Sequence, residues 1–171
     1  MAKSDGKKAK AAAATELAAS PTHLLHRVLQ RATGFYAEEM GDDALTQRQY
    51  ALLVAVANSE GPSQTELVNL TGIDRSTLAE LVARMIERGL LARSRSDTDG
   101  RAKTVSLTEA GAAALEAARP RVRAADKRIL ALLPKPKRET FLKLLSRVAD
   151  SSEPAPKTTS RSKPRKKDKS A

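Results

Sequence analysis

Residues 63–108 (SQTELVNLTGIDRSTLAELVARMIERGLLARSRSDTDGRAKTVSLT) change from helical to strand periodicity within one short stretch. Ser63 and Glu66 form a capping-box pattern, and Gly72 is placed to end the helix that follows. Asp74 is the expected N-cap of a second helix. Its apolar residues recur at helical spacing and form a buried stripe: Leu78, Leu81, Val82, Met85 and Ile86. The pattern predicts a helix-turn-helix, although an ordinary helical hairpin would look the same.

Two strand-like runs follow these helices, at residues 90–95 and 103–107. The segment between them is rich in Asp and Gly, which is typical of a turn. Basic residues give the hairpin a cationic polar face: Arg93, Arg95, Arg101 and Lys103. A solvated charged hairpin is the plain alternative. The hairpin comes directly after a helix-turn-helix in the sequence, which favours the interpretation as a β-hairpin wing.

A winged helix-turn-helix points to duplex DNA as the partner. The start of the second helix would meet base edges in the major groove, where Arg75 can reach guanine or phosphate. Arg101 at the hairpin tip can enter a minor groove, with Asp99 holding its guanidinium by a charge-assisted hydrogen bond. The predicted DNA-contacting residues are Ser63, Gln64, Thr65, Asp74, Arg75, Ser76, Thr77, Glu80, Arg84, Arg93, Arg95, Asp99, Arg101 and Lys103.

Helical patterns flank this stretch on both sides. Ser20-Pro21 is expected to start a first helix that ends at Gly41, and Thr46 to cap a second. Thr108 is expected to cap a long helix that Pro120 should kink or split, and a last helix covers about 137–149. The fold class is therefore mainly α with a small β-hairpin wing. We expect a domain over residues 20–149, with a DNA-binding lobe at about 45–108 and dimerisation helices at 20–41 and 108–149.

The net charge of +11 is concentrated in the two ends of the chain. Residues 1–19 and 150–171 are predicted to be disordered basic arms, which could add affinity for DNA phosphates or serve only as solvated tails. The absence of Cys excludes a disulfide framework and a thiolate metal site in this chain. No apolar run is long enough for a transmembrane helix, so we expect a cytoplasmic, nucleoid-associated protein.

The sequence from Leu45 to Gly111 resembles the MarR family of winged helix-turn-helix regulators. The most specific segment is LLARSRSDTDGRAKTVSLTEAG. It is similar to the family's wing and the start of the next helix at Arg93, Asp99, Arg101, Leu107, Thr108 and Gly111. LTQRQYALL, DRSTLAELVARMIERGLL and LPKPKRETFLKLLSRVA resemble the second, recognition and closing helices. One departure is Glu80, where many members have a basic residue. Because Glu can accept from cytosine N4, a different base sequence would be read.

The resemblance implies a homodimer that binds a pseudo-palindromic operator and is most often a repressor. It also implies release by a small anionic or aromatic ligand, for which an aromatic carboxylate or an aryl-CoA thioester is expected. The candidate ligand-binding residues are His23, Arg27, Arg31, Phe35, Tyr36, Leu45, Tyr50 and Arg123. Each of them could equally be a dimer-interface or surface residue.

Two other functions compete with a ligand-controlled regulator. A ligand-independent architectural DNA-binding protein would use the basic arms for affinity. An enzyme is disfavoured, because the sequence has no Cys nucleophile, no phosphate-binding Gly loop and no paired His-carboxylate set. We expect no cofactor, no metal and no membrane partner.

Overall fold

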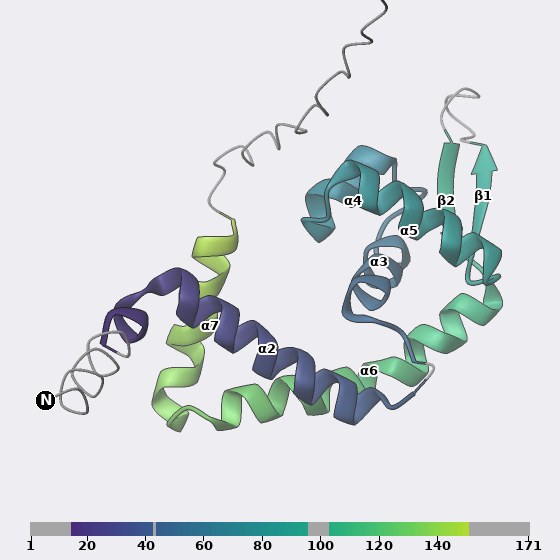
Figure 1. Cartoon of the computed structure of the whole chain (residues 1–171). Coiled ribbons are helices and arrows are strands. Elements are labelled where there is room, and N and C mark those ends of the chain that lie inside the picture. Colours follow the sequence, from purple (N-terminus) through teal and green to yellow (C-terminus); the bar gives the residue numbers. More distant parts are fainter. Residues whose placement is uncertain (1–14, 43, 96–102, 151–171) are drawn as a thin grey trace, which may run out of the picture. The chain divides into compact units, whose positions relative to one another are not determined.

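The computed structural model describes residues 15–42, 44–95 and 103–150, without the side chains of residues 94, 95 and 103. The chain divides into two compact units, residues 1–133 and 134–171. The first unit contains α2 (Pro21–Met40), α3 (Gln47–Ala57), α4 (Gln64–Thr71), α5 (Arg75–Glu87), β1 (Leu91–Arg95), β2 (Lys103–Leu107) and α6 (Glu109–Ala131) (Figure 1). The second contains the 3₁₀ turn η1 (Lys135–Lys137) and α7 (Arg138–Ala149).

The predicted N-caps are confirmed at five helix starts. The side chains of Ser20, Thr46, Ser63, Asp74 and Thr108 each accept a hydrogen bond from the backbone N–H three residues later. Thr46 and Ser63 also receive the return bond of a capping box on their own backbone N–H. These bonds satisfy N–H groups that a helix leaves without an internal partner, so short polar residues fix where the helices begin.

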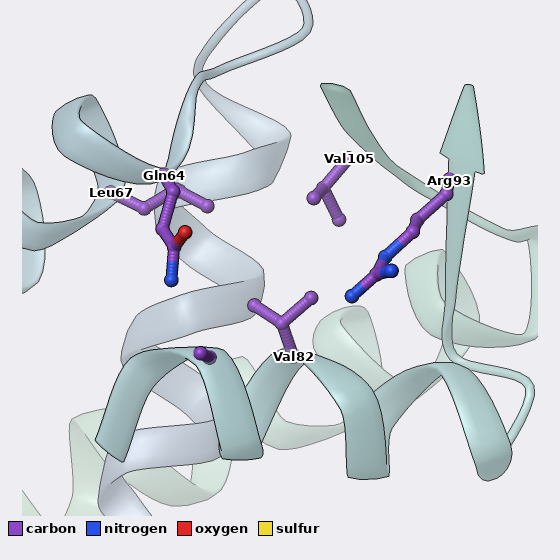
Figure 2. A pocket seen from close by; sticks show the side chains of 6 residues that line it. Gln64, Leu67, Val82, Arg93 and Val105 are labelled. Carbon is purple, nitrogen blue, oxygen red and sulfur yellow. The ribbon is translucent and has the colours of Figure 1, made fainter. Parts of the chain in front are cut away.

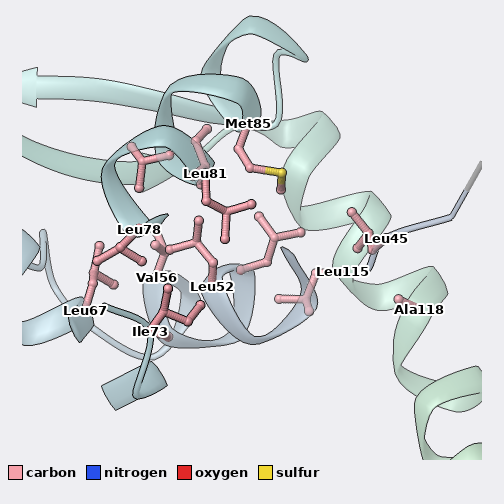
Figure 3. Packing of buried hydrophobic residues seen from close by; sticks show 14 of the residues in the cluster. Leu45, Leu52, Val56, Leu67, Ile73, Leu78, Leu81, Met85, Leu115 and Ala118 are labelled. Carbon is pink, nitrogen blue, oxygen red and sulfur yellow. The ribbon is translucent and has the colours of Figure 1, made fainter. Parts of the chain in front are cut away.

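One hydrophobic core joins the helix-turn-helix to the wing and to α6. Its fully buried large side chains come from α3, α4, α5, β1 and α6: Leu52, Leu53, Leu67, Leu78, Met85, Leu91 and Leu115. Figure 3 shows Leu78, Leu81 and Met85 of α5 pointing into this cluster. The buried stripe expected for the second helix of the motif is therefore the face that fixes α5, and its opposite face stays free.

The two strands of the wing pair antiparallel, with Leu91 opposite Leu107 and Arg93 opposite Val105. Residues opposite one another in such a ladder share a face. Leu91 and Val105 are buried, so this face of the hairpin packs toward the helices.

Thr108 and Gly111 attach the start of α6 to the turn that follows α5. The Thr108 hydroxyl donates to Gly89 O at 2.7 Å, and the Thr108 N–H donates to Leu90 O at 3.2 Å. A Cβ at position 111 would lie 1.9 Å from Leu90 O, so only glycine fits there. The turn after α5 and the beginning of α6 are thus held by direct backbone contact.

Helix α2 runs along α6 and is held there by arginines (Figure 1). Arg128 bonds Glu38 at 2.5 Å and Glu39 at 2.9 Å, and its guanidinium lies 4.2 Å from the centre of the Phe35 ring. Arg121 donates to Met40 O at 2.8 Å. Charge-assisted bonds of this kind are stronger than neutral ones.

Helix α6 continues unbroken through Pro120, so the predicted split near Arg119 does not occur, and the alternative of a kink there stays a prediction. Pro120 is exposed. The helix lacks the hydrogen bond that a backbone N–H at position 120 would have donated, but it continues through the turns on either side of the proline.

Apolar side chains are exposed on α2 and, separately, on α7. On α2 these are Leu24, Leu25, Val28 and Leu29, and on α7 they are Leu142, Leu144 and Val148. Residues 15–19, part of the arm expected to be disordered or only loosely helical, are helical. The run TELAA consists largely of strong helix formers, which explains this difference.

Candidate DNA-binding surface and ligand pockets

The start of α5 is organised by Asp74. Its carboxylate accepts from the backbone N–H of Thr77 at 3.0 Å and from the hydroxyl of Ser76 at 2.7 Å. These hydrogen bonds hold the pKa of Asp74 well below its usual range, and the bond from the Thr77 N–H has the largest effect. Asp74 therefore stays ionised and caps the helix, and the Ser76 hydroxyl is occupied by the cap.

The start of α4 lies beside the start of α5. The Gln64 amide donates to Arg75 O at 3.3 Å, which connects the two helices of the motif. Glu66 closes the capping box by accepting from the Ser63 N–H at 2.7 Å, and this bond lowers its pKa. Ser63 and Thr65 are exposed at the same helix end. The predicted residues at the two helix starts, Ser63, Gln64, Thr65 and Arg75, are thus brought together, whereas Glu80 and Arg84 lie further along α5.

Three long charged side chains lie on the exposed side of α5, from its first turn to its last. They are Arg75, Glu80 and Arg84, and all three are exposed. Glu80 and Arg84 form an i,i+4 pair at 4.0 Å, with 75% and 61% of their side chains exposed. An ion pair so long and so exposed contributes little to stability, so both groups are available to a partner.

Arg93 of the wing faces the same region. Together with Val105 it lines a hollow of about 140 Å³ against α4 and α5, whose other walls are Gln64, Leu67, Ala79 and Val82. Figure 2 shows the Arg93 guanidinium extending over Val82 toward α5. The structure therefore brings this predicted residue next to the recognition helix.

The tip of the wing is only partly described. Arg95 and Lys103 are opposite one another in the strand register, which places both at the far end of the ladder. Asp99 and Arg101, predicted to form the tip, lie outside the described residues.

The predicted ligand-binding residues are brought together only in part. The Tyr36 hydroxyl donates to Leu45 O at 2.9 Å, and both residues are buried. Burial, with smaller contributions from Tyr50 and Asp126, raises the pKa of Tyr36 to about 12. Burial also raises the pKa of Asp126. Tyr36, Leu45 and Tyr50 therefore mark one region where α2, α3 and α6 meet.

Tyr36 makes the folded protein sensitive to alkali, and Tyr36→Phe tests this. The ordinary pKa of Tyr is about 10, so between pH 10 and 12 the unfolded chain loses this proton first and stability falls as pH rises. We expect Tyr36→Phe to lose about 0.5–1.5 kcal/mol at neutral pH with the Leu45 hydrogen bond, and to decline less steeply above pH 10. Urea unfolding from pH 8 to 11.5 measures both. Parallel pH profiles for the two proteins would contradict the assignment.

Two hollows border this region. The first has a volume of about 410 Å³ and is lined by Tyr50, Ala51, Val54, Ala55, Asn58, Ser59 and Leu70. The second, of about 470 Å³, is lined by Thr33, Tyr36, Ala37, Met40, Gly41, Ala44, Leu45, Thr46, Gln47 and Arg48. Both are lined mainly by apolar groups with a few polar ones, which suits a small aromatic ligand.

The other predicted ligand residues do not line these two hollows. Arg27, Arg31 and Arg123 are exposed, His23 is half-buried near the start of α2, and Phe35 packs under Arg128. Sequence reasoning also missed Arg128 and Asp126. The signal for Arg128 was the acidic pair Glu38-Glu39, but a pairing across about ninety residues cannot be read from local spacing.

Two further observations concern the described part of the chain. It contains no cluster of three or more His, Asp or Glu side chains suited to a metal ion. Among its helices, none combines the length and apolar character that a membrane span requires.

Comparison with known proteins accounts for this arrangement. The model of the MarR family matches residues 45–102, which include α3, α4, α5 and β1. The HTH-type transcriptional repressor NicR of Pseudomonas putida is 35% identical over 133 residues, which cover 78% of this chain and 84% of the relative. The chain belongs to the MarR family of winged helix-turn-helix transcriptional regulators.

Solved structures of the family agree with the fold. Bordetella bronchiseptica BpsR, whose DNA binding is regulated by 6-hydroxynicotinic acid, superposes with a TM-score of 0.74 at 28% identity, covering 78% of this chain and 95% of its own. The transcriptional repressor CouR bound to a 23-mer DNA duplex gives 0.72 at 28% identity, with 78% and 95% covered. CouR from Rhodococcus jostii RHA1 bound to p-coumaroyl-CoA gives 0.69 at 28% identity, with 80% and 96% covered. The winged helix-turn-helix prediction is confirmed.

Proposed function

We propose that this protein is a homodimeric, sequence-specific DNA-binding repressor that is released by a small aromatic or anionic ligand. The observation that carries the proposal is the exposed face of α5. Arg75 lies there beside the capped start of α4, Arg84 is exposed further along the same helix, and Arg93 of the wing lines a hollow against α5. In this proposal α5 enters the major groove, with its N-terminal turns against the base edges.

Contacts with phosphates come from groups at the edge of this surface. The exposed Ser63 and Thr65 at the start of α4 can donate to a phosphate, and a helix N-terminus favours an anion. Arg93 extends from the wing toward the same groove. Arg101 would reach the flanking minor groove, as the family wing does, although it lies outside the described residues.

The apolar faces of α2 and α7 support the dimer. In one copy Leu25 and Leu29 are 49% and 59% exposed, and Leu144 and Val148 are 58% and 62% exposed. Large apolar side chains that are clustered on one face of a helix and exposed to solvent indicate an interaction surface. A second copy that covers these faces would also place two recognition helices at a fixed separation, as a palindromic site requires.

The hollow lined by Tyr50, Val54, Asn58 and Leu70 is the proposed ligand site. Its volume of about 410 Å³ fits an aromatic acid, and the aromatic part of a thioester could enter it with the CoA outside. The ligands of BpsR and CouR are an aromatic acid and an aryl-CoA thioester, which supports this class. Release requires the ligand to bind the conformation that does not fit DNA more tightly than the one that does.

The ligand half of the proposal is tested by a thermal-shift screen of hydroxylated aromatic acids and their CoA thioesters, followed by DNA-release assays. A ligand present at 100 times its Kd should stabilise the protein by about 2.7 kcal/mol and should displace bound DNA. Val54→Trp fills the hollow and should abolish the shift while DNA binding remains. A compound that stabilises Val54→Trp as strongly as the wild type would place the ligand elsewhere. DNA binding that no compound reverses would favour the architectural alternative.

A further inference from the structure

The exposed row of α5 contains an acidic side chain, Glu80, in the N-terminal half of the helix, which faces a DNA groove in the proposed function. Ser76, Glu80 and Arg84 are spaced four residues apart and therefore share one side of the helix. The Ser76 hydroxyl is held by Asp74 at 2.7 Å, so it is already committed to the cap. Glu80 and Arg84 are the long side chains of this row with groups free to meet a base.

Glu80 contributes little to the stability of the fold. Its side chain is 75% exposed, and its contact with Arg84 is 4.0 Å long. An i,i+4 pair of this kind is weak and is screened by salt. A stabilising role in the fold therefore does not explain an acidic residue at this position.

A carboxylate on this face is unfavourable for general binding, because duplex DNA is densely negative. It becomes favourable only opposite a hydrogen-bond donor on a base edge. In the major groove such donors are the N4 amino group of cytosine and the N6 amino group of adenine. Adenine carries the N7 acceptor beside N6, which repels a carboxylate, whereas cytosine has no acceptor on that edge.

We infer that Glu80 is a specificity-determining residue that accepts a hydrogen bond from the amino group of a cytosine in each half-site. This inference rests on the proposed function of the same surface. Glu80 favours cytosine because its carboxylate accepts from the cytosine amino group. Opposite a base without that donor, its negative charge faces only phosphates and base acceptors, which repel it, so binding to other sequences is disfavoured. Arg84, 4.0 Å away, supplies a donor for phosphate or guanine next to it.

The test is selection of binding sites from a random DNA library by the full-length wild-type protein, Glu80→Ala and Glu80→Gln. The wild type should enrich cytosine at one position in each half-site. Glu80→Ala should lose roughly 5- to 150-fold of discrimination at that position and keep the rest of the motif. Glu80→Gln should change the preference there to adenine, since Gln pairs with N6 and N7 together.

Glu87→Gln is the matched control, because it removes the same charge from the exposed C-terminal end of the same helix. It should leave the enriched base unchanged. Arg84→Ala should weaken binding across sequences and keep the cytosine preference. If Arg84→Ala reproduced the effect of Glu80→Ala, Glu80 would only position Arg84 and the inference would be overturned.

Two other outcomes are also distinguishable. A wild-type motif that Glu80→Ala leaves intact, with affinity raised equally for all sequences, would make Glu80 a purely repulsive group and overturn the inference alone. A wild type that enriches no motif would overturn both this inference and the proposed sequence-specific function.

Discussion

Replacing Gly111 with alanine is expected to destabilise the protein by about 3 kcal/mol or more, the upper end of the usual cost of overpacking. The added Cβ would lie 1.9 Å from Leu90 O and 2.9 Å from Leu90 C, which are backbone atoms and cannot rotate away. Relief requires α6 to move from the turn after α5, which would break the bonds from Thr108 to Gly89 O and Leu90 O. Urea unfolding followed by circular dichroism measures this loss.

Gly34→Ala is the matched control, since Gly34 is also a helical glycine but its added Cβ meets nothing within 4 Å. Alanine is the better helix former, so this variant should gain up to about 1 kcal/mol. The pair separates a steric requirement from helix propensity. Equal changes in both variants would show that the contact at Leu90 does not constrain position 111.

Replacing Arg75 with alanine is expected to weaken binding to the operator by about 1–3 kcal/mol, or roughly 5- to 150-fold. Arg75 is the first residue of α5 and is exposed there, and its backbone carbonyl is fixed by Gln64 at 3.3 Å. If it binds guanine, the variant should also tolerate other bases at one position of each half-site. Fluorescence anisotropy with operator DNA and with single-base variants gives both quantities.

Arg88→Ala controls for loss of charge, because Arg88 lies at the other end of α5 and donates to Gln49 at 3.3 Å. This variant should reduce affinity only slightly and leave base preference unaltered. Equal losses from Arg75→Ala and Arg88→Ala would mean that α5 contributes charge to binding but does not read bases at its N-terminus.

The helix starts could be predicted from the sequence because the hydrogen bonds that fix them join residues close together in the chain. A capping side chain bonds an N–H three residues away, so Ser63 and Asp74 identified their helices without any tertiary information. The end of α3 was less explicit. It comes at Ala57, where the side-chain amide of Asn58 donates to Val54 O at 2.8 Å.

The parts that could not be predicted depend on residues far apart in the chain. Arg128 meets Glu38 and Glu39 only because α6 returns along α2, and spacing within either helix does not encode that contact. The requirement for glycine at position 111 likewise depends on the path of Leu90. The candidate ligand residues were least predictable, since a pocket between helices needs their packing, and Arg27 and Arg31 proved to be exposed.

Sequence-specific binding by α5 and the wing is tested by footprinting of the full-length protein on genomic DNA in the presence of excess random competitor. We expect a protected inverted repeat whose half-site centres are about one helical turn, or 34–36 Å, apart, and whose protection survives the competitor. Protection that the competitor removes equally from every site would contradict sequence-specific reading by α5 and the wing.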